Sequence, residues 1–196
     1  MRMHTLVRQL LEDMNNAERQ AFHTLLLMDM AGALYVKKER EYEDPVYFNL
    51  TSTLNTLFPN RKKSSGVYKR VVLFKRVVLK FEIIRDSYNK YGNNNVASEV
   101  SMWKRFAAKK GKLADRVYLA PTAAISKHIS VQKRYDKRGT EKEACWLEDT
   151  VGWGNDGDGE IGDIHTGNFR KDGERLVIID FANNYPSSKS WDGGSF

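Results

Sequence analysis

Apolar residues recur every three or four positions through the first 30 residues of the chain, which is the spacing of amphipathic helices. Two polar residues, Asn15 and Asn16, interrupt the series. We therefore expect two helices, with Asn16 as the N-cap of the second. Core packing is the simplest use of their apolar stripe, and a groove for a partner is the alternative. The apolar positions are Leu6, Leu10, Met14, Ala17, Ala21, Leu25 and Met28.

Beyond residue 66 the pattern changes to short runs rich in Val, Ile, Leu, Phe and Tyr, which are typical of strands, with helical stretches among them. Residues 42–66 carry no such periodicity, and Pro45 and Pro59 mark them as irregular. The expected elements are strands at residues 67–74 and 76–84, a helix at 97–110, strands at 117–119 and 129–132, and a helix at 141–150.

A β-hairpin is predicted after residue 168. Two short apolar runs, at residues 169–170 and 176–179, flank residues 171–173, which read Lys-Asp-Gly. An Asp-Gly pair favours a tight turn, because glycine adopts a positive φ without a steric cost. Residues 152–162 before the hairpin are acidic and rich in glycine, so they are expected to form a loop.

The composition fits one compact domain. With 196 residues, of which 41% are hydrophobic, the chain can bury a core. Cys145 is the single cysteine, so no internal disulfide can form, which suits a reducing cytoplasm. No apolar stretch is long enough for a membrane span. We therefore expect a cytoplasmic protein without a membrane partner, and its oligomeric state is not indicated.

Positive charge is in excess and unevenly spread. The chain has 32 Lys and Arg against 25 Asp and Glu, a net charge of +7, with basic clusters at residues 61–63, 69–76 and 104–112. Surfaces that bind nucleic acid interleave aromatic residues with such clusters. Only Tyr68 and Phe74 are candidates, and both lie in a predicted strand. We therefore expect solvated basic faces, with docking of an acidic protein as the alternative, and no nucleic-acid partner.

Oxygen-bearing side chains stand on both sides of the predicted hairpin. Asp163 and Asn168 precede it, within Gly-Asp-Ile-His-Thr-Gly-Asn, and Asp180 follows it, within Ile-Ile-Asp-Phe. Because a hairpin doubles back, we expect Asn168 and Asp180 to lie close together. Asp163 could accept a proton from an attacking hydroxyl, and the other two carry the hard oxygen ligands that Mg²⁺ prefers. His165 is expected to fix the shape of the loop by a hydrogen bond, and a place near the substrate is the alternative. The alternative is that Asp163 and Asn168 only form turns.

This arrangement resembles the catalytic loop and the metal-binding segment of the protein-kinase-like superfamily. The run Asp-Ile-His-Thr-Gly-Asn is closest to bacteriophage early Ser/Thr protein kinases and to aminoglycoside-type phosphotransferases, although Ile161 stands where many members have a histidine. The resemblance implies an α+β protein-kinase-like fold with an antiparallel-sheet upper lobe, N-terminal helices and a much reduced lower lobe. Residues 1–44 would be the N-terminal helical segment, and residues 45–196 the reduced kinase-like domain.

Residues upstream follow the order of the same family's nucleotide site. Lys80 resembles the strand lysine that holds the α and β phosphates, and Glu99 resembles the helix glutamate that pairs with it. Lys69 and Lys75 are alternatives to Lys80 as the phosphate contact. The alternative for Glu99 is an ordinary exposed position on a helix.

The resemblance also implies cofactors and an activity. Ser65 and Gly66 would belong to the segment that covers the phosphates, and adenine would be held near residues 132–135. The implied cofactors are ATP and Mg²⁺. The implied function is an ATP- and Mg²⁺-dependent phosphotransferase of the phage Ser/Thr protein kinase type, acting on host proteins in the host cytoplasm. Two alternatives are a catalytically inactive kinase-like protein that binds and inhibits a host protein, and transfer to a small molecule.

Overall fold

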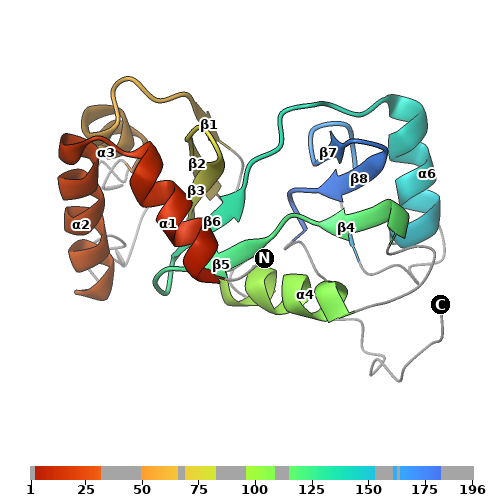
Figure 1. The fold of residues 1–196 in the computed structure, drawn as a ribbon, viewed down its shortest axis with the longest axis horizontal. Helices are drawn as coiled ribbons and strands as arrows, with labels where there is room; N and C mark the ends of the chain where they lie inside the picture. Colours follow the sequence, from red (N-terminus) through yellow and green to blue (C-terminus); the bar gives the residue numbers. More distant parts are fainter. Residues whose placement is uncertain are drawn as a thin grey trace, which may run out of the picture. The chain divides into compact units, whose positions relative to one another are not determined.

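The computed structural model of the chain contains two units, each with its own sheet and core (Figure 1). One unit comprises Met1–Arg85 with Thr122–Arg134, and the other comprises Asp86–Pro121 with Tyr135–Phe196. Helices accompany mainly antiparallel strands, in agreement with the expected α+β class. The residues that the structure describes are 3–31, 50–65, 69–82, 96–108, 115–152, 161–162 and 164–181.

The first unit is built on a five-stranded antiparallel sheet in the order β1-β2-β3-β6-β5. The two neighbouring strands predicted on either side of Lys75 are confirmed, with Val72 opposite Leu79. The strands β1 and β5 lie outside the predicted set, because three residues are too few to show an alternating pattern. The bounds are β1 (Lys63–Ser65), β2 (Lys69–Leu73), β3 (Val77–Glu82), β5 (Thr122–Ala124) and β6 (Ile129–Lys133).

Alternation along the strands gives this sheet one apolar and one polar face. The apolar face packs with the N-terminal helices to form the core of the unit, so the apolar stripe of the first 30 residues mainly serves core packing. α1 contacts β3, β5 and β6, and α3 contacts β2. The helices are α1 (Met3–Asp13), α2 (Asn16–Met30) and α3 (Leu50–Leu57). Buried members of this core include Leu6, Leu10, Leu25, Leu54, Phe58, Phe74, Leu79 and Phe81.

Helix α2 is capped one residue earlier than the sequence pattern predicts. Asn15, and not Asn16, is the N-cap: its backbone is extended (φ −76°, ψ 174°), and its side chain accepts the Glu18 N–H at 2.9 Å. Glu18 Oε2 accepts the Asn15 N–H at 2.9 Å, which completes a capping box. Both asparagines suit an N-cap, and the glutamate three residues after Asn15 decides between them.

Helix α3 lies within the stretch that the sequence analysis expects to be irregular. Its sequence, Leu-Thr-Ser-Thr-Leu-Asn-Thr-Leu, is rich in residues of low helix propensity. Leu50 and Leu54 stand one turn apart and are both buried, and Phe58 follows on the same face. Burial of these side chains therefore offsets the weak local preference. In the described ranges no helix is long and apolar enough to span a membrane.

One ion pair ties the helices to the strands in the first unit. Arg61 Nε lies 2.7 Å from Glu18 Oε1, and Arg61 Nη2 lies 2.8 Å from Oε2 of the same carboxylate. The guanidinium also donates to the Asp13 carbonyl at 2.6 Å and lies 4.7 Å from the centroid of the Phe74 ring. The hydrogen bond from Arg61 lowers the pKa of Glu18, although burial opposes the shift. Arg61 thus joins the start of α2 to the core.

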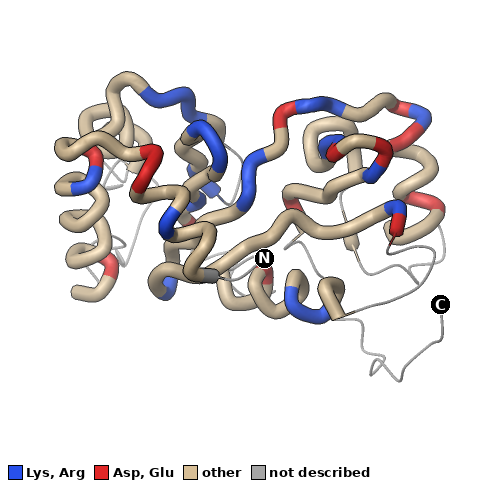
Figure 2. The backbone as a smooth tube through the Cα atoms, in the orientation of Figure 1, with Lys and Arg blue, Asp and Glu red and all other residues tan. Residues whose placement is uncertain are grey.

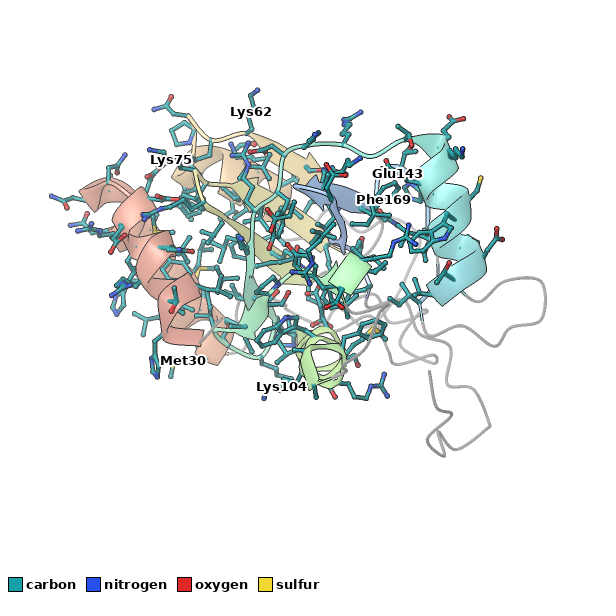
Figure 3. All side chains as sticks on the ribbon, turned by 45° about the vertical axis from the view of Figure 1, so that its right-hand side comes forward. Met30, Lys62, Lys75, Lys104, Glu143 and Phe169 are labelled. Carbon is teal, nitrogen blue, oxygen red and sulfur yellow. The ribbon has the colours of Figure 1, made fainter. Side chains whose placement is uncertain are left out.

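Basic residues recur on the segment before β1 and on the turn between β2 and β3 (Figure 2). Some of them bond within the unit: Arg76 pairs with Asp13 at 2.8 Å, and Lys63 Nζ donates to the Phe58 carbonyl at 2.6 Å. Lys62 and Lys75 are exposed, and Lys62 points away from the sheet (Figure 3). Some of these basic residues therefore form the solvated face expected from the sequence, and others bond to residues of the same unit.

The second unit is built on a three-stranded sheet in the order β4-β8-β7, with β4 parallel and β7 antiparallel to β8. The strand expected at residues 117–119, the helices expected at 97–110 and 141–150, and the hairpin are confirmed with small shifts of their bounds. Gly173 has a φ of 62°, the positive value that the turn requires. The bounds are α4 (Val96–Ala108), β4 (Val117–Leu119), α6 (Glu141–Val151), β7 (Phe169–Asp172) and β8 (Arg175–Ile178).

We expect Glu18→Gln to lower the free energy of unfolding at neutral pH by about 2 kcal/mol, because Arg61 loses its charged acceptor. The pKa of Glu18 is lowered, so this contribution is complete above the unfolded pKa of about 4.3 and is lost as the pH falls through the folded value. Urea unfolding of the wild type and the variant should therefore show their midpoints converging in acid.

Glu12→Gln is the matched control. The Glu12 side chain is 49% exposed where it pairs with Arg76, so its loss should cost less than about 0.5 kcal/mol. A loss at Glu12 equal to the loss at Glu18, or a Glu18 effect that does not change with pH, would contradict the ion pair with Arg61.

Candidate functional site

The hairpin brings Asn168 and Asp180 together. Phe169 and Ile178 are opposite one another in the register of β7 and β8. Beyond this pair, the Asn168 carbonyl accepts the Ile179 N–H at 2.8 Å and the Asp180 N–H at 3.4 Å. Two of the three predicted oxygen-bearing residues are therefore backbone neighbours at one end of the hairpin.

The chemistry of this pair of residues fits a magnesium ion. Asp180 is exposed and Asn168 is half-buried. Mg²⁺ is bound in nucleotide sites by one or two carboxylates, with phosphate and water oxygens completing the octahedron. Within the described ranges no three His, Cys, Asp or Glu side chains form a group that could hold a metal ion. Asp163 lies outside the described residues.

His165 shapes the loop that carries Asn168. The His165 carbonyl accepts the Asn168 N–H at 2.8 Å, and its Nδ1 accepts the Gly167 N–H at 3.0 Å. A Cβ on Gly167 would lie 2.5 Å from the imidazole Cε1, so glycine leaves room for this ring. The expectation that His165 fixes the loop by a hydrogen bond is thus confirmed.

Phe169 anchors the same loop in the core of the second unit. Its side chain is fully buried among the residues of that core (Figure 3). Gly139 approaches it so closely that an added Cβ would lie 1.9 Å from the Phe169 Cε2. The residue directly after Asn168 is therefore held by close packing.

Arg170 also stabilises this loop, by hydrogen bonds to its backbone, and the sequence analysis does not predict this role. Its Nη1 lies 2.6 Å from the Phe169 carbonyl, 3.0 Å from the Gly167 carbonyl and 3.4 Å from the Thr166 carbonyl. These carbonyls flank Asn168 on both sides. The partners are backbone atoms, so no pattern of side chains in the sequence points to this role.

Lys80 lies on the polar face of the five-stranded sheet. Its neighbours across the strands are Val71 and Ser130, and Gln132 and Thr122 are opposite one another in the next row of that face. Gln132 Nε2 donates to Thr122 Oγ1 at 2.9 Å. Lys80 is 5% exposed, and none of these five residues belongs to the apolar core of the unit. Buried polar side chains need hydrogen-bond partners, and Gln132 and Thr122 supply one for each other.

The two alternatives to Lys80 lie in different surroundings. Lys69 shares the polar face, is buried, and stands opposite Glu82 at the end of the sheet ladder. Lys75 lies in the exposed turn between β2 and β3, away from that face. Lys80 is therefore the lysine at the centre of the polar face.

Glu99 is fully buried in α4, so it is not the ordinary exposed glutamate that was the alternative for it. Burial of a carboxylate is costly unless a partner compensates it. Lys80 and Glu99 belong to different units, and their pairing stays a prediction. Gly66 and the side chain of Ser65 lie outside what the structure describes.

No protein-family model matches the chain, and no curated protein matches it. A solved structure of the ternary complex of APH(2″)-IIa with streptomycin and ATP resembles part of it, at 16% sequence identity and a TM-score of 0.30. The match covers 55% of this chain and 34% of that one, so the chain spans about a third of that protein. A similarity of this size assigns neither the fold nor the function.

Gly139→Ala is expected to lower the free energy of unfolding by about 2 kcal/mol, because the added methyl group would overlap the Phe169 ring. Phe169→Leu should relieve most of this overlap. The double variant should therefore be more stable than the sum of the two single effects predicts. Urea unfolding of the wild type, both single variants and the double variant measures this coupling, and strictly additive effects would contradict the contact.

Proposed function

We propose that this chain is a phosphotransferase that moves the γ-phosphoryl group of ATP, with Mg²⁺, to a Ser or Thr hydroxyl of a protein. The observation that supports it most is the meeting of Asn168 and Asp180 at the end of the hairpin. The backbones of these two residues are hydrogen-bonded to one another. A carboxamide oxygen and a carboxylate oxygen are the ligands that a nucleotide-bound Mg²⁺ takes in kinases.

In this proposal each residue of the hairpin and its loop has a separate role in phosphoryl transfer. Asp163 is the base that accepts the proton of the acceptor hydroxyl. Asn168 and Asp180 hold Mg²⁺, which when bound neutralises charge on the phosphate oxygens. His165, Phe169 and Arg170 keep the loop in shape, and their bonds and packing support this assignment.

The resemblance to the kinase-like superfamily also assigns roles to Lys80, Glu99, Ser65 and Gly66. Lys80 orients the phosphates, and its burial among polar neighbours supports this role. Glu99 positions Lys80, which agrees with the unusual burial of a helix glutamate. Ser65 and Gly66 belong to the segment over the phosphates.

The acceptor that we propose is a host protein, by resemblance of the Asp-Ile-His-Thr-Gly-Asn run to phage early kinases. A protein that binds and inhibits a host partner without turnover is the second candidate. Ile161 favours it, because this fully buried side chain stands where many family members have a histidine and cannot hydrogen-bond the loop.

Incubation with γ-labelled ATP and Mg²⁺ is expected to label the wild-type chain or an added acceptor protein. Asp163→Asn should reduce the rate about 100-fold or more, because general-base catalysis contributes at least that much. Asp180→Asn should reduce it similarly and should also abolish the rise in melting temperature caused by ATP with Mg²⁺.

Asp149→Asn on α6 is the matched control, since it removes one exposed carboxylate from the same unit. It should leave labelling within about twofold of the wild type. A thermal shift without any labelling would favour the binding protein. Labelling that survives both Asp163→Asn and Asp180→Asn would overturn the proposed site.

A further inference from the structure

An arginine pair stands on the edge of the small sheet. Residues 137–139 run beside β7: the Lys171 N–H donates to the Lys137 carbonyl at 2.8 Å, and Arg138 and Arg170 form an isolated antiparallel bridge. Residues opposite one another in such a bridge send their side chains to the same face, with Cβ atoms about 4.5–5.5 Å apart. The side chains of Arg138 and Arg170 therefore leave the backbone at adjacent positions.

This pair lacks a carboxylate bonded to it in the described part of the chain. Arg170 donates through Nη1 to three backbone carbonyls, which leaves its Nε and Nη2 hydrogens available. Arg138 is exposed and forms no hydrogen bond or ion pair with a described residue.

Other charged side chains near the two arginines interact with other residues. On the same face, Asp172 accepts a hydrogen bond from the Tyr118 hydroxyl, and the Arg175 guanidinium lies 4.1 Å from the centroid of that tyrosine ring. On the opposite face, Lys171 pairs with Glu143 at 2.5 Å. Like charges opposite one another destabilise a strand pair. Two arginines on opposite positions of one bridge, with N–H donors left over, therefore point to an anionic ligand.

We propose that Arg138 and Arg170 form a binding site for a phosphate group, separate from the nucleotide chemistry proposed above and independent of it. Two planar guanidinium groups offer paired N–H donors that match the spacing of phosphate oxygens. A bound dianion would replace their repulsion with charge-assisted hydrogen bonds. Because Arg170 also holds the carbonyls around Asn168, the anion would contact a residue that shapes this loop.

The test uses the full chain without ATP or Mg²⁺, titrated with inorganic phosphate at low ionic strength and followed by calorimetry and thermal unfolding. Arg138→Gln should weaken phosphate binding about tenfold or more. The same substitution should raise the melting temperature of the phosphate-free protein, because the repulsion is removed. Opposite signs of these two effects distinguish a binding role from a purely structural one.

Lys142→Gln is the matched control, since Lys142 is an exposed cation of α6 in the same unit, and it should change neither quantity. Unchanged phosphate affinity in Arg138→Gln would overturn the site. So would an equal loss in Lys142→Gln, which would indicate attraction by net charge, or an equal loss in Lys80→Met, which would place the anion with Lys80.

A phosphoserine peptide identifies the source of the phosphate group. Tighter binding of this peptide than of inorganic phosphate assigns the site to a phosphorylated protein, and weaker binding assigns it to the free ion. Both results support the site, provided that Arg138→Gln weakens whichever ligand binds. Absence of labelling by ATP would remove the proposed phosphotransfer and leave this result intact, because no nucleotide is present.

Discussion

The proposed chemistry depends on one backbone constraint, which is that the Asn168 carbonyl accepts the N–H groups of both Ile179 and Asp180. The constraint follows from the hairpin: the tight turn at Gly173 sets the register, which then runs without a slip to Phe169 opposite Ile178. A slip of one residue would turn Phe169 out of the core and separate Asn168 from Asp180. Burial of Phe169 therefore protects the geometry of its neighbours, since the same register satisfies both the core and the site.

The first unit uses the same two-residue period for another purpose. In β3, Leu79 and Phe81 enter the apolar core, and Lys80 between them faces the opposite side with Ser130 as its neighbour. Both faces of this strand are buried, which explains why it reads as an almost continuous apolar run interrupted by one lysine. That single interruption is informative, because a lysine in the middle of a strand buried on both faces needs polar surroundings, which Ser130, Thr122 and Gln132 provide.

Periodicity in the sequence predicts the long elements and the hairpin, because each repeats its pattern over enough residues to be recognised. It fails for α3, whose helix depends on burial of Leu50 and Leu54 and not on propensity, and for β1 and β5, which have three residues each. The meeting of Asn168 and Asp180 can be predicted because it needs only a turn. The role of Arg170 cannot, since its partners are carbonyls that every residue has. Nor can the burial of Glu99, because one turn of helix gives no sign of what covers it.

The basic residues show most clearly what the structure adds to the sequence, which is how each charge is paired. In the sequence Arg61, Arg138 and Arg170 look alike, because each is an arginine next to other Lys or Arg residues. The fold gives Arg61 a carboxylate, so its charge is used to hold α2 against the strands. It gives Arg170 a set of carbonyls and places Arg138 beside it, so part of their charge is left without a bonded counter-charge among the described residues. A net charge of +7 therefore says little about partners, because what matters is which cations the fold has already neutralised.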